Sequence, residues 1–256
     1  MVGSAMRERL KSAANAGLSG YDDILRWKSR RRPRLLVYTD SRGLNVASRL
    51  VRRHYNGSYV HRLQWRYSTD YVVSPHSHTT ILDFLNYVAN RKLDAYDAII
   101  MHCGIVDFSP RPLSNVERVR AGKQGMPLFG ELFAANAEYY ANPWSVEYEG
   151  EPTINLYSLE YLRTTLLPSL QAIPNLIWIS PNRFVAGWNG NYARGRPANI
   201  GSVVAEFEAA VKAGLPRVVD LWKWSDREVR TFTIDNIHFS RPGFKRLTAL
   251  IEAELV

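Results

Sequence analysis

The stretch Leu35-Leu36-Val37-Tyr38-Thr39-Asp40-Ser41-Arg42-Gly43 decides the fold of this chain. Four apolar residues of high β-propensity run directly into an aspartate, a serine and, two residues later, a glycine. A helical pattern begins immediately afterwards. This order predicts a buried strand, a sharp turn and a helix, with the Ser41 hydroxyl at the carboxyl end of the strand. A hydroxyl in that place suits a nucleophile or an anion site, whereas Asp40 and Ser41 could also simply cap the helix.

Strand and helix patterns alternate along the rest of the chain. Further strands are predicted at residues 58–67, 97–104, 175–180 and 217–221, with helical patterns between them at 44–51, 81–88, 155–171 and 199–213 and after them at 241–255. This alternation predicts a three-layer α/β/α sandwich around a central five-stranded parallel sheet. In a flavodoxin-like strand order, 2-1-3-4-5, ligands bind where the strand order reverses, between the first and third strands.

The 256 residues are predicted to form one domain with two additions. Residues 1–33 form a helical extension. Residues 108–153 are rich in Pro, Gly, Asn and aromatic residues with weak periodicity, which indicates an irregular, lid-like insertion over the strand ends. There is no transmembrane segment, because no apolar run approaches the roughly 18 residues that span a bilayer. The absence of a signal-peptide pattern and the single cysteine, Cys103, favour a cytoplasmic location.

The net charge of +9 is concentrated near the N-terminus. Residues 1–66 hold 15 Lys and Arg against 4 Asp and Glu, including the run Arg30-Arg31-Arg32-Pro33-Arg34. Such a segment could bind an acidic polymer or an anionic membrane face, or be only a solvated surface. Aromatic residues do not alternate with the basic ones as in RNA-recognition surfaces, so we do not expect nucleic acid as a partner.

Two further polar segments are predicted at the same edge of the sheet as Ser41. Gly104-Ile105-Val106-Asp107 leaves the third strand, and Asp235-Asn236-Ile237-His238 leads into the last helix. A hydroxyl, an imidazole and a carboxylate at one edge would form a nucleophile, its base and the group that orients the base. The three-residue spacing lets Asp235 accept from one ring nitrogen of His238 while the other nitrogen faces the serine.

These segments resemble the sequence blocks of the SGNH, or GDSL-type, hydrolases. Thr39-Asp40-Ser41 is similar to the Gly-Asp-Ser block of that family, and Gly104-Ile105-Val106-Asp107 to its Gly-x-Asn-Asp block. Asp235-Asn236-Ile237-His238 matches its Asp-x-x-His block before the last helix. The resemblance covers residues 34–107 and 155–256 and implies the same α/β/α fold.

The resemblance also implies a reaction. Ser41 would attack an acyl carbonyl, His238 would act as general base and then acid, and Asp235 would orient His238. The implied function is a serine esterase that cleaves an O-acyl ester, such as an O-acetyl group on a carbohydrate or polysaccharide, without a cofactor. Two alternatives stay open: an O-acyltransferase with the same triad in polysaccharide modification, and a catalytically silent fold that binds a glycan.

Two oxyanion donors of the family are missing from this sequence. Val106 stands where the third block has its asparagine, and residues 67–80 contain no glycine to match the second block. The backbone amide of Ser41 is then the donor that remains of the family set. We therefore assign oxyanion or substrate binding to Ser41 and to neighbouring turn and polar groups: Arg42, His102, Gly104, Asp107, Arg111 and the backbone amides of residues 74–77.

Some of these residues also have an ordinary structural interpretation. His102 could be a hydrogen-bonded interior histidine, and Asp107 could hold the geometry of its loop. Cys103 is more typical of a small buried hydrophobe than of a nucleophile. The pair His76-x-His78 could bind a metal, but no carboxylate or cysteine stands near it in the sequence, so we expect no metal.

Overall fold

The computed structural model describes residues 20–46, 57–73 and 78–255. Within these ranges a five-stranded parallel sheet forms the centre of the molecule, in the order β2-β1-β3-β7-β8. The three-layer sandwich and its strand order are therefore confirmed. The strands are β1 (Arg34–Thr39), β2 (Ser68–Val73), β3 (Ala98–His102), β7 (Leu176–Ile179) and β8 (Val218–Val219).

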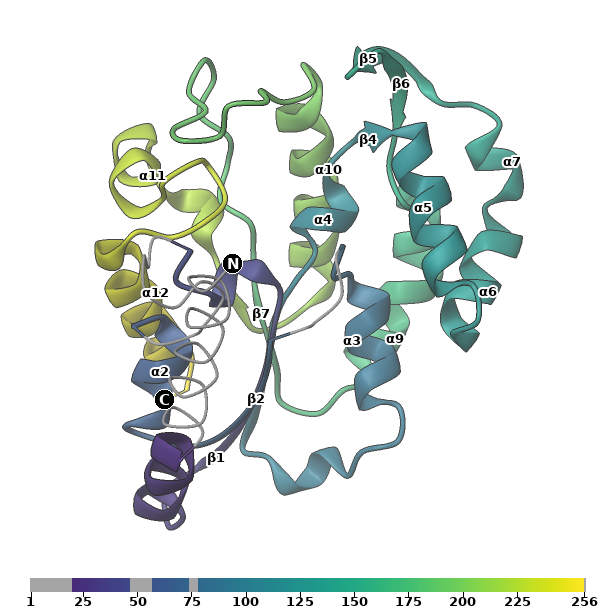
Figure 1. Cartoon of the computed structure of the whole chain (residues 1–256). Coiled ribbons are helices and arrows are strands. Elements are labelled where there is room, and N and C mark those ends of the chain that lie inside the picture. The colour runs from purple at the N-terminus through teal and green to yellow at the C-terminus, as the bar shows by residue number, and fades with distance from the viewer. Residues whose placement is uncertain (1–19, 47–56, 74–77, 256) are drawn as a thin grey trace, which may run out of the picture.

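Helices cover both faces of the sheet (Figure 1). One face carries α2 (Tyr59–Gln64), η4 (Leu221–Lys223), α11 (Asp226–Phe232) and α12 (Arg241–Glu254). The other carries α3 (Ile81–Val88), α4 (Ile105–Phe108), α8 (Leu159–Tyr161) with the π-helical turn η3 (Leu162–Leu166), α9 (Leu167–Gln171) and α10 (Ile200–Gly214). A short turn, η2 (Leu93–Ala95), precedes β3, and residues 20–29 are helical.

The sequence of β1 explains why it lies inside the sheet. Leu35 and Val37 pack into the apolar cluster on one face, and Leu36 and Tyr38 pack into the cluster on the other. All four side chains are at most 3% exposed. A strand buried on both faces needs a continuous apolar run rather than an alternating one, and this run supplies it.

The prediction of a strand at residues 58–67 is wrong. Residues 59–64 form α2, and the second strand is β2, immediately after it. Tyr59, Val60 and Leu63 are fully buried and lie on one helical face, so the spacing that suggested a half-buried strand has the helical period. The true edge strand, with the sequence STDYVV, is mostly half-buried and polar at its start.

The insertion at residues 108–153 is folded rather than irregular, which corrects the expectation from its composition. It contains three helices, α5 (Leu113–Lys123), α6 (Pro127–Ala135) and α7 (Ala137–Tyr140). It also forms most of a small antiparallel sheet in the order β4-β6-β5, with β4 (Arg111–Pro112), β5 (Trp144–Tyr148) and β6 (Glu151–Ile154). The periodicity was weak because the strands are only two to five residues long and because α5, the longest helix of the insertion, buries only three of its 11 residues. That it acts as a lid stays a prediction.

A buried ion pair joins this insertion to the main domain. The Lys123 ammonium of α5 donates to the Asp83 carboxylate of α3 at 2.6 Å and to the backbone carbonyl of His78 at 2.8 Å. The Lys123 and Asp83 side chains are 8% and 1% exposed. Asp83 also accepts from the backbone amide and the hydroxyl of Thr80, the N-cap of α3. One carboxylate therefore anchors both the start of α3 and the end of α5.

The basic run at residues 30–34 lies at the opposite end of β1 from Ser41. Arg34 opens the strand, pairs with Asp70 of β2 at 2.8 Å and stacks over the ring of Tyr96. The Arg32 side chain donates to the backbone carbonyl of Trp65. Residues 1–19 lie outside the described residues, as does most of the helix expected at 44–51. None of the helices in the described ranges has the length and apolar character that a membrane crossing requires.

Replacing Lys123 by methionine should destabilise the protein. The change leaves the Asp83 carboxylate buried without its counter-charge, which typically lowers the free energy of unfolding by about 3–5 kcal/mol. Urea unfolding followed by circular dichroism measures this. Lys245→Met, at an exposed position of α12, is the control and should change stability by no more than about 0.5 kcal/mol. Equal effects of the two variants would contradict a structural role for the ion pair.

Candidate active site

Ser41 lies at the turn that follows β1. The strand is held to β3 as far as its last residues, since the Asp40 amide donates to the carbonyl of His102 at 3.1 Å. The chain then enters a 3₁₀ turn, η1 (Ser41–Gly43). A Cβ atom at Gly43 would lie 2.3 Å from the Thr39 methyl carbon. Glycine is needed there because the chain folds back onto the buried Thr39 side chain.

The two neighbours of Ser41 form a buried ion pair. The Arg42 guanidinium donates to both carboxylate oxygens of Asp40, at 2.9–3.1 Å, and the Arg42 amide donates to the same carboxylate at 2.8 Å. Both side chains are 2% exposed. Ser41 itself is exposed. Arg42, which we expected to bind substrate or an oxyanion, is therefore directed into the protein and occupied by Asp40.

The segment Asp235–His238 forms a tight turn around one carboxylate. Asp235 accepts from the amide of His238 at 2.7 Å, from the amide of Ile237 at 3.0 Å and from Nδ1 of His238 at 2.7 Å. Asn236 has a positive φ of 67°, which asparagine tolerates better than most residues. Its side chain accepts from the amide of Val185 at 2.9 Å and so fixes the turn to the loop after β7.

The structure brings Ser41 and His238 within hydrogen-bond distance. Ser41 Oγ lies 3.1 Å from His238 Nε2, across a separation of 197 residues. Because Nδ1 faces the Asp235 carboxylate, the hydrogen-bond pattern places the ring proton on Nδ1 and leaves Nε2 to accept from the serine hydroxyl. The three side chains thus have the order and spacing of a nucleophile, a base and an orienting carboxylate.

Asp235 is suited to stay ionised. Burial alone would raise its pKa, but the hydrogen bond and the charge of the His238 ring, together with the two backbone amides, outweigh burial and leave the pKa below its usual value. An ionised carboxylate holds the imidazole in one orientation and stabilises the imidazolium that forms when the serine proton is taken.

His102 lies beneath the turn rather than in the open site. It is fully buried, and its Nδ1 contacts the Tyr59 hydroxyl at 2.9 Å. Its Nε2 has no hydrogen-bond partner among the described residues. Burial first, and the charge of Arg42 second, lower its pKa well below the usual value, so the ring is neutral. His102 is therefore an uncharged residue that packs beneath the turn, and it is not available to bind a substrate or an oxyanion as we had expected.

Gly104 and Asp107 hold the loop after β3. Gly104 has a φ of 119° and begins α4, where a side chain would press on the ring of Phe108. The Asp107 carboxylate is fully buried and accepts from the Ile81 amide at 2.8 Å and from the Tyr157 hydroxyl at 2.7 Å. Both contacts tie α4 to neighbouring elements, and neither residue is open to a substrate.

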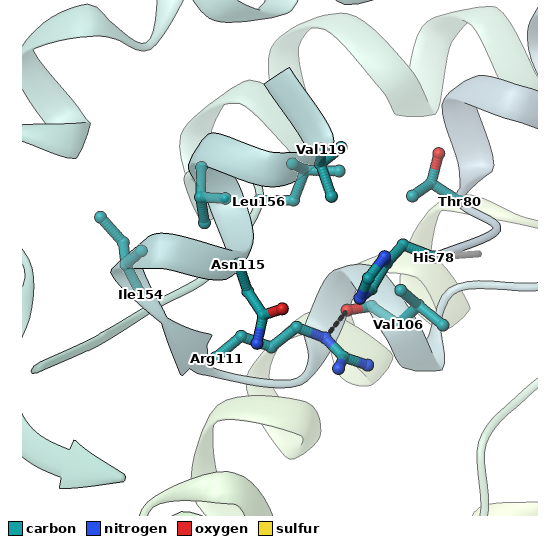
Figure 2. A pocket seen from close by; sticks show the side chains of 9 residues that line it. His78, Thr80, Val106, Arg111, Asn115, Val119, Ile154 and Leu156 are labelled. Atoms are coloured by element: carbon teal, nitrogen blue, oxygen red, sulfur yellow. Dashed lines mark hydrogen bonds between the residues drawn. The ribbon is translucent and has the colours of Figure 1, made fainter. Parts of the chain in front are cut away.

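Arg111 lines a small cavity between α4, α5 and the start of α3 (Figure 2). The cavity is shallow: its space holds about one water molecule, and part of it is open to solvent. Four residues form its polar part (His78, Thr80, Arg111 and Asn115), and five apolar ones form the rest (Val106, Val116, Val119, Ile154 and Leu156). Val106 is the residue in place of the family's oxyanion asparagine, so this cavity adjoins the loop where that donor would lie.

Two residues of this region, Arg196 and Gly190, were not singled out in the sequence, and a third, His78, was considered there only as a metal ligand. Arg196 donates to the backbone carbonyl of Asp235 at 2.6 Å. His78 lines the cavity with a positive φ of 60°, at the end of the loop where the family has its second block. Gly190 passes so close to Ile234 that a Cβ atom would lie 2.0 Å from its carbonyl oxygen. For Gly190, the sequence offered one signal, a glycine beside several polar residues. The positions of Arg196 and His78 depend on tertiary contacts and could not be predicted from the sequence.

No group of three or more His, Cys, Asp or Glu residues in the described ranges is arranged to hold a metal ion. His76 lies outside the described residues, as do the backbone amides of residues 74–77. Cys103 is fully buried, and burial raises the pKa of its thiol well above the usual value.

Comparisons with solved structures give the class of fold. The chain is similar to a lipase/acylhydrolase from Enterococcus faecalis, with a TM-score of 0.51 and 16% identity over 87% of this chain and 95% of that one. It is also similar to Est24, a carbohydrate acetylesterase from Sinorhizobium meliloti, with a TM-score of 0.50 and 14% identity over 88% and 98% of the two chains. No protein-family model and no curated protein sequence matches.

The chain therefore has the α/β/α fold of the SGNH hydrolases, and the resemblance read from the sequence is confirmed at the level of the fold. Identities below one fifth do not carry substrate or activity from one protein to the other. What the site does must be argued from its own residues.

Burial of Asp107 predicts a pH dependence of stability. Burial raises its pKa to about 7, although the Ile81 amide and the Tyr157 hydroxyl act in the opposite direction. The folded protein then binds a proton that the unfolded chain has released between about pH 4 and 7, so the contribution of this group to stability falls as the pH rises through that window.

Asp107→Asn should remove this contribution. Compared with the variant, the wild-type protein should lose about 2–4 kcal/mol of unfolding free energy between pH 4 and pH 7.5. Urea unfolding across that range measures the difference. Parallel pH profiles for the two proteins would contradict an Asp107 that is neutral in the fold.

Proposed function

We propose that this protein is a serine ester hydrolase in which Ser41 is the nucleophile, His238 the general base and acid, and Asp235 the orienting carboxylate. The observation that carries the proposal is the continuous hydrogen-bonded path from Ser41 Oγ to His238 Nε2 at 3.1 Å, and from Nδ1 to Asp235 at 2.7 Å. The exposed serine and the 25% exposed imidazole leave room for a substrate.

The reaction runs in two halves. Ser41 Oγ attacks the acyl carbonyl while its proton moves to His238 Nε2, and the carbonyl oxygen becomes an oxyanion. The intermediate collapses to an acyl-serine, and the alcohol leaves with the proton from His238. A water molecule then attacks the acyl-serine with His238 again as the base, which releases the carboxylic acid and restores Ser41.

The Ser41 amide is a donor for the oxyanion, since it has no hydrogen-bond acceptor among the described residues. Val106 offers no side-chain donor, and Arg42 and His102 are occupied or buried. Of the polar side chains that we considered as substitutes, Arg111 alone faces an open cavity. Loss of one oxyanion donor typically lowers the rate about 10²–10³-fold, so we expect a modest turnover number unless a further group compensates.

A short acyl group on a carbohydrate is the substrate that we favour. The hollow next to the Val106 loop holds about one water molecule, so it offers no channel for a fatty acyl chain. A protein of the same fold is a carbohydrate acetylesterase, which supports this choice.

Ser41→Ala should abolish hydrolysis of 4-nitrophenyl acetate. Removal of the nucleophile of a triad typically lowers kcat by about 10⁶-fold, so the residual rate should be indistinguishable from the uncatalysed one. Release of nitrophenolate, followed at 405 nm, is the measurement. Ser202→Ala, an exposed serine on α10, is the matched control and should keep full activity. Wild-type activity in the Ser41→Ala protein would overturn the proposed mechanism.

A further inference from the structure

Two arginines, Arg196 at Asp235 and Arg111 at the loop after β3, form no ion pair with a carboxylate in the described part of the chain. Both are half-buried. The cations buried elsewhere are paired: Arg42 with Asp40, and Lys123 with Asp83. Asp107 acts on Arg111 and Asp235 on Arg196 through their charge, but neither carboxylate accepts a hydrogen bond from the guanidinium, so donors of both groups stay available to a ligand.

Arg196 is fixed beside the triad by three contacts. One Nη atom donates to the carbonyl of Asp235 at 2.6 Å. The guanidinium also stacks over the rings of Tyr192, at 4.5 Å, and Phe184, at 5.3 Å. Its Nε atom is buried and has no acceptor among the described residues. Its position is thus set by the protein, while part of its hydrogen-bonding capacity is unused.

Arg111 is held by a single contact to the loop after β3. Its Nε makes a long contact of 3.4 Å with the carbonyl of Val106, which Figure 2 shows as a dashed line. The side chains of His78 and Asn115 line the same cavity. No hydrogen-bond partner of the two Arg111 Nη atoms occurs within the described ranges.

The small antiparallel sheet links the segments that carry the two arginines. Arg111 is in β4, and the Tyr148 hydroxyl of β5, in the same sheet, donates to the carbonyl of Gly195, next to Arg196, at 3.1 Å. In agreement with this geometry, burial first, and the charge of Arg196 in addition, lower the pKa of Arg111. Arg111, together with Lys123 and Arg118, adds to burial in lowering the pKa of His78 to about 4, so this ring is neutral at pH 7. An anion placed here would relieve the repulsion between the arginines and satisfy their free donors.

We propose that Arg111 and Arg196 form a binding subsite for a carboxylate of the substrate, so that the enzyme acts on esters that carry a negative charge close to the acyl group. The inference rests on the proposed function and specifies its substrate class. The carboxylate can come from the alcohol side, as in an O-acylated uronic acid, or from the acyl side, as in a half-ester of a dicarboxylic acid. A planar, two-donor guanidinium matches a carboxylate better than an ammonium does.

Two pairs of esters test the subsite and separate the two sources. 4-Acetoxybenzoate and its methyl ester differ by a carboxylate on the alcohol side. Mono-4-nitrophenyl glutarate and 4-nitrophenyl butyrate differ by a carboxylate on the acyl side. For each pair the quantity of interest is the ratio of kcat/KM for the charged ester to that for the neutral one, measured for each protein.

Arg111→Gln and Arg196→Gln should each lower this ratio by about 10- to 100-fold in one of the two pairs, because each removes a charge-assisted hydrogen bond to the carboxylate. Arg111→Lys should keep part of the preference for the charged ester, since lysine retains the positive charge but cannot form the two parallel hydrogen bonds of a guanidinium to a carboxylate. Arg120→Gln makes the same change of charge at an exposed position of α5 outside the cavity and should leave the ratio as in wild type.

Added salt should lower the ratio in the wild-type protein and should lower it much less in Arg111→Gln.

Other results would overturn the subsite. If Arg111→Gln lowers kcat/KM equally for charged and neutral esters, Arg111 serves the chemical step and not a substrate anion. If Arg120→Gln lowers the ratio as much as Arg111→Gln does, the preference for charged esters comes from the overall positive charge of the protein surface and not from a subsite. If hydrolysis depends on Ser41 but Arg111→Gln and Arg196→Gln leave the ratio unchanged in both pairs of esters, the proposed function stands and the subsite is rejected.

A binding measurement keeps the test independent of turnover. The Ser41→Ala protein should bind 4-acetoxybenzoate about 10-fold or more tightly than does the double variant with Arg111→Gln, by ligand-observed NMR titration. If no ester is hydrolysed by the wild-type protein but this difference is found, the proposed function fails and the anion subsite stands. Equal binding by the two proteins rejects the subsite.

Discussion

The buried ion pair between Asp40 and Arg42 is the constraint on which the candidate site depends. It fixes the residues on both sides of Ser41, and the Arg42 amide donates to the same carboxylate. Each charge would be strongly unfavourable alone at this depth, so the pair is stable only in the geometry that satisfies both groups. Ser41 is thereby presented to solvent by a turn that has little freedom of its own.

The rest of the site is assembled around this turn by the sheet. β1 ends at the turn, its neighbour β3 leads into α4, and the segment that carries Asp235 and His238 returns to the same edge from the other end of the chain. Positive charge is also divided between the two ends of β1. The basic run at residues 30–34 lies at the amino end, while Arg196 lies at Asp235 and Arg111 at the loop after β3.

How much could be predicted from the sequence depended on the range of the interactions. The fold class and β1 follow from local patterns, and the strand order follows from the flavodoxin-like arrangement assumed for the sheet. Ser41, Asp235 and His238 follow from residue order at one sheet edge. The prediction of a strand at residues 58–67 failed because, over only six residues, the apolar spacing of a helix such as α2 does not differ clearly from that of a half-buried strand. The role of Arg42 and the proximity of Arg196 to Asp235 could not be predicted, because both depend on side-chain contacts rather than on spacing.

Covalent labelling tests the central claim, that Ser41 is a nucleophile activated by His238, most directly. The protein is incubated with a small fluorophosphonate, and intact mass followed by peptide mapping locates the adduct. We predict a single phosphonyl group on Ser41, formed far more slowly in His238→Ala, because the base no longer accepts the serine proton. An adduct on another residue, or labelling of Ser41 at the same rate in His238→Ala, would contradict the account.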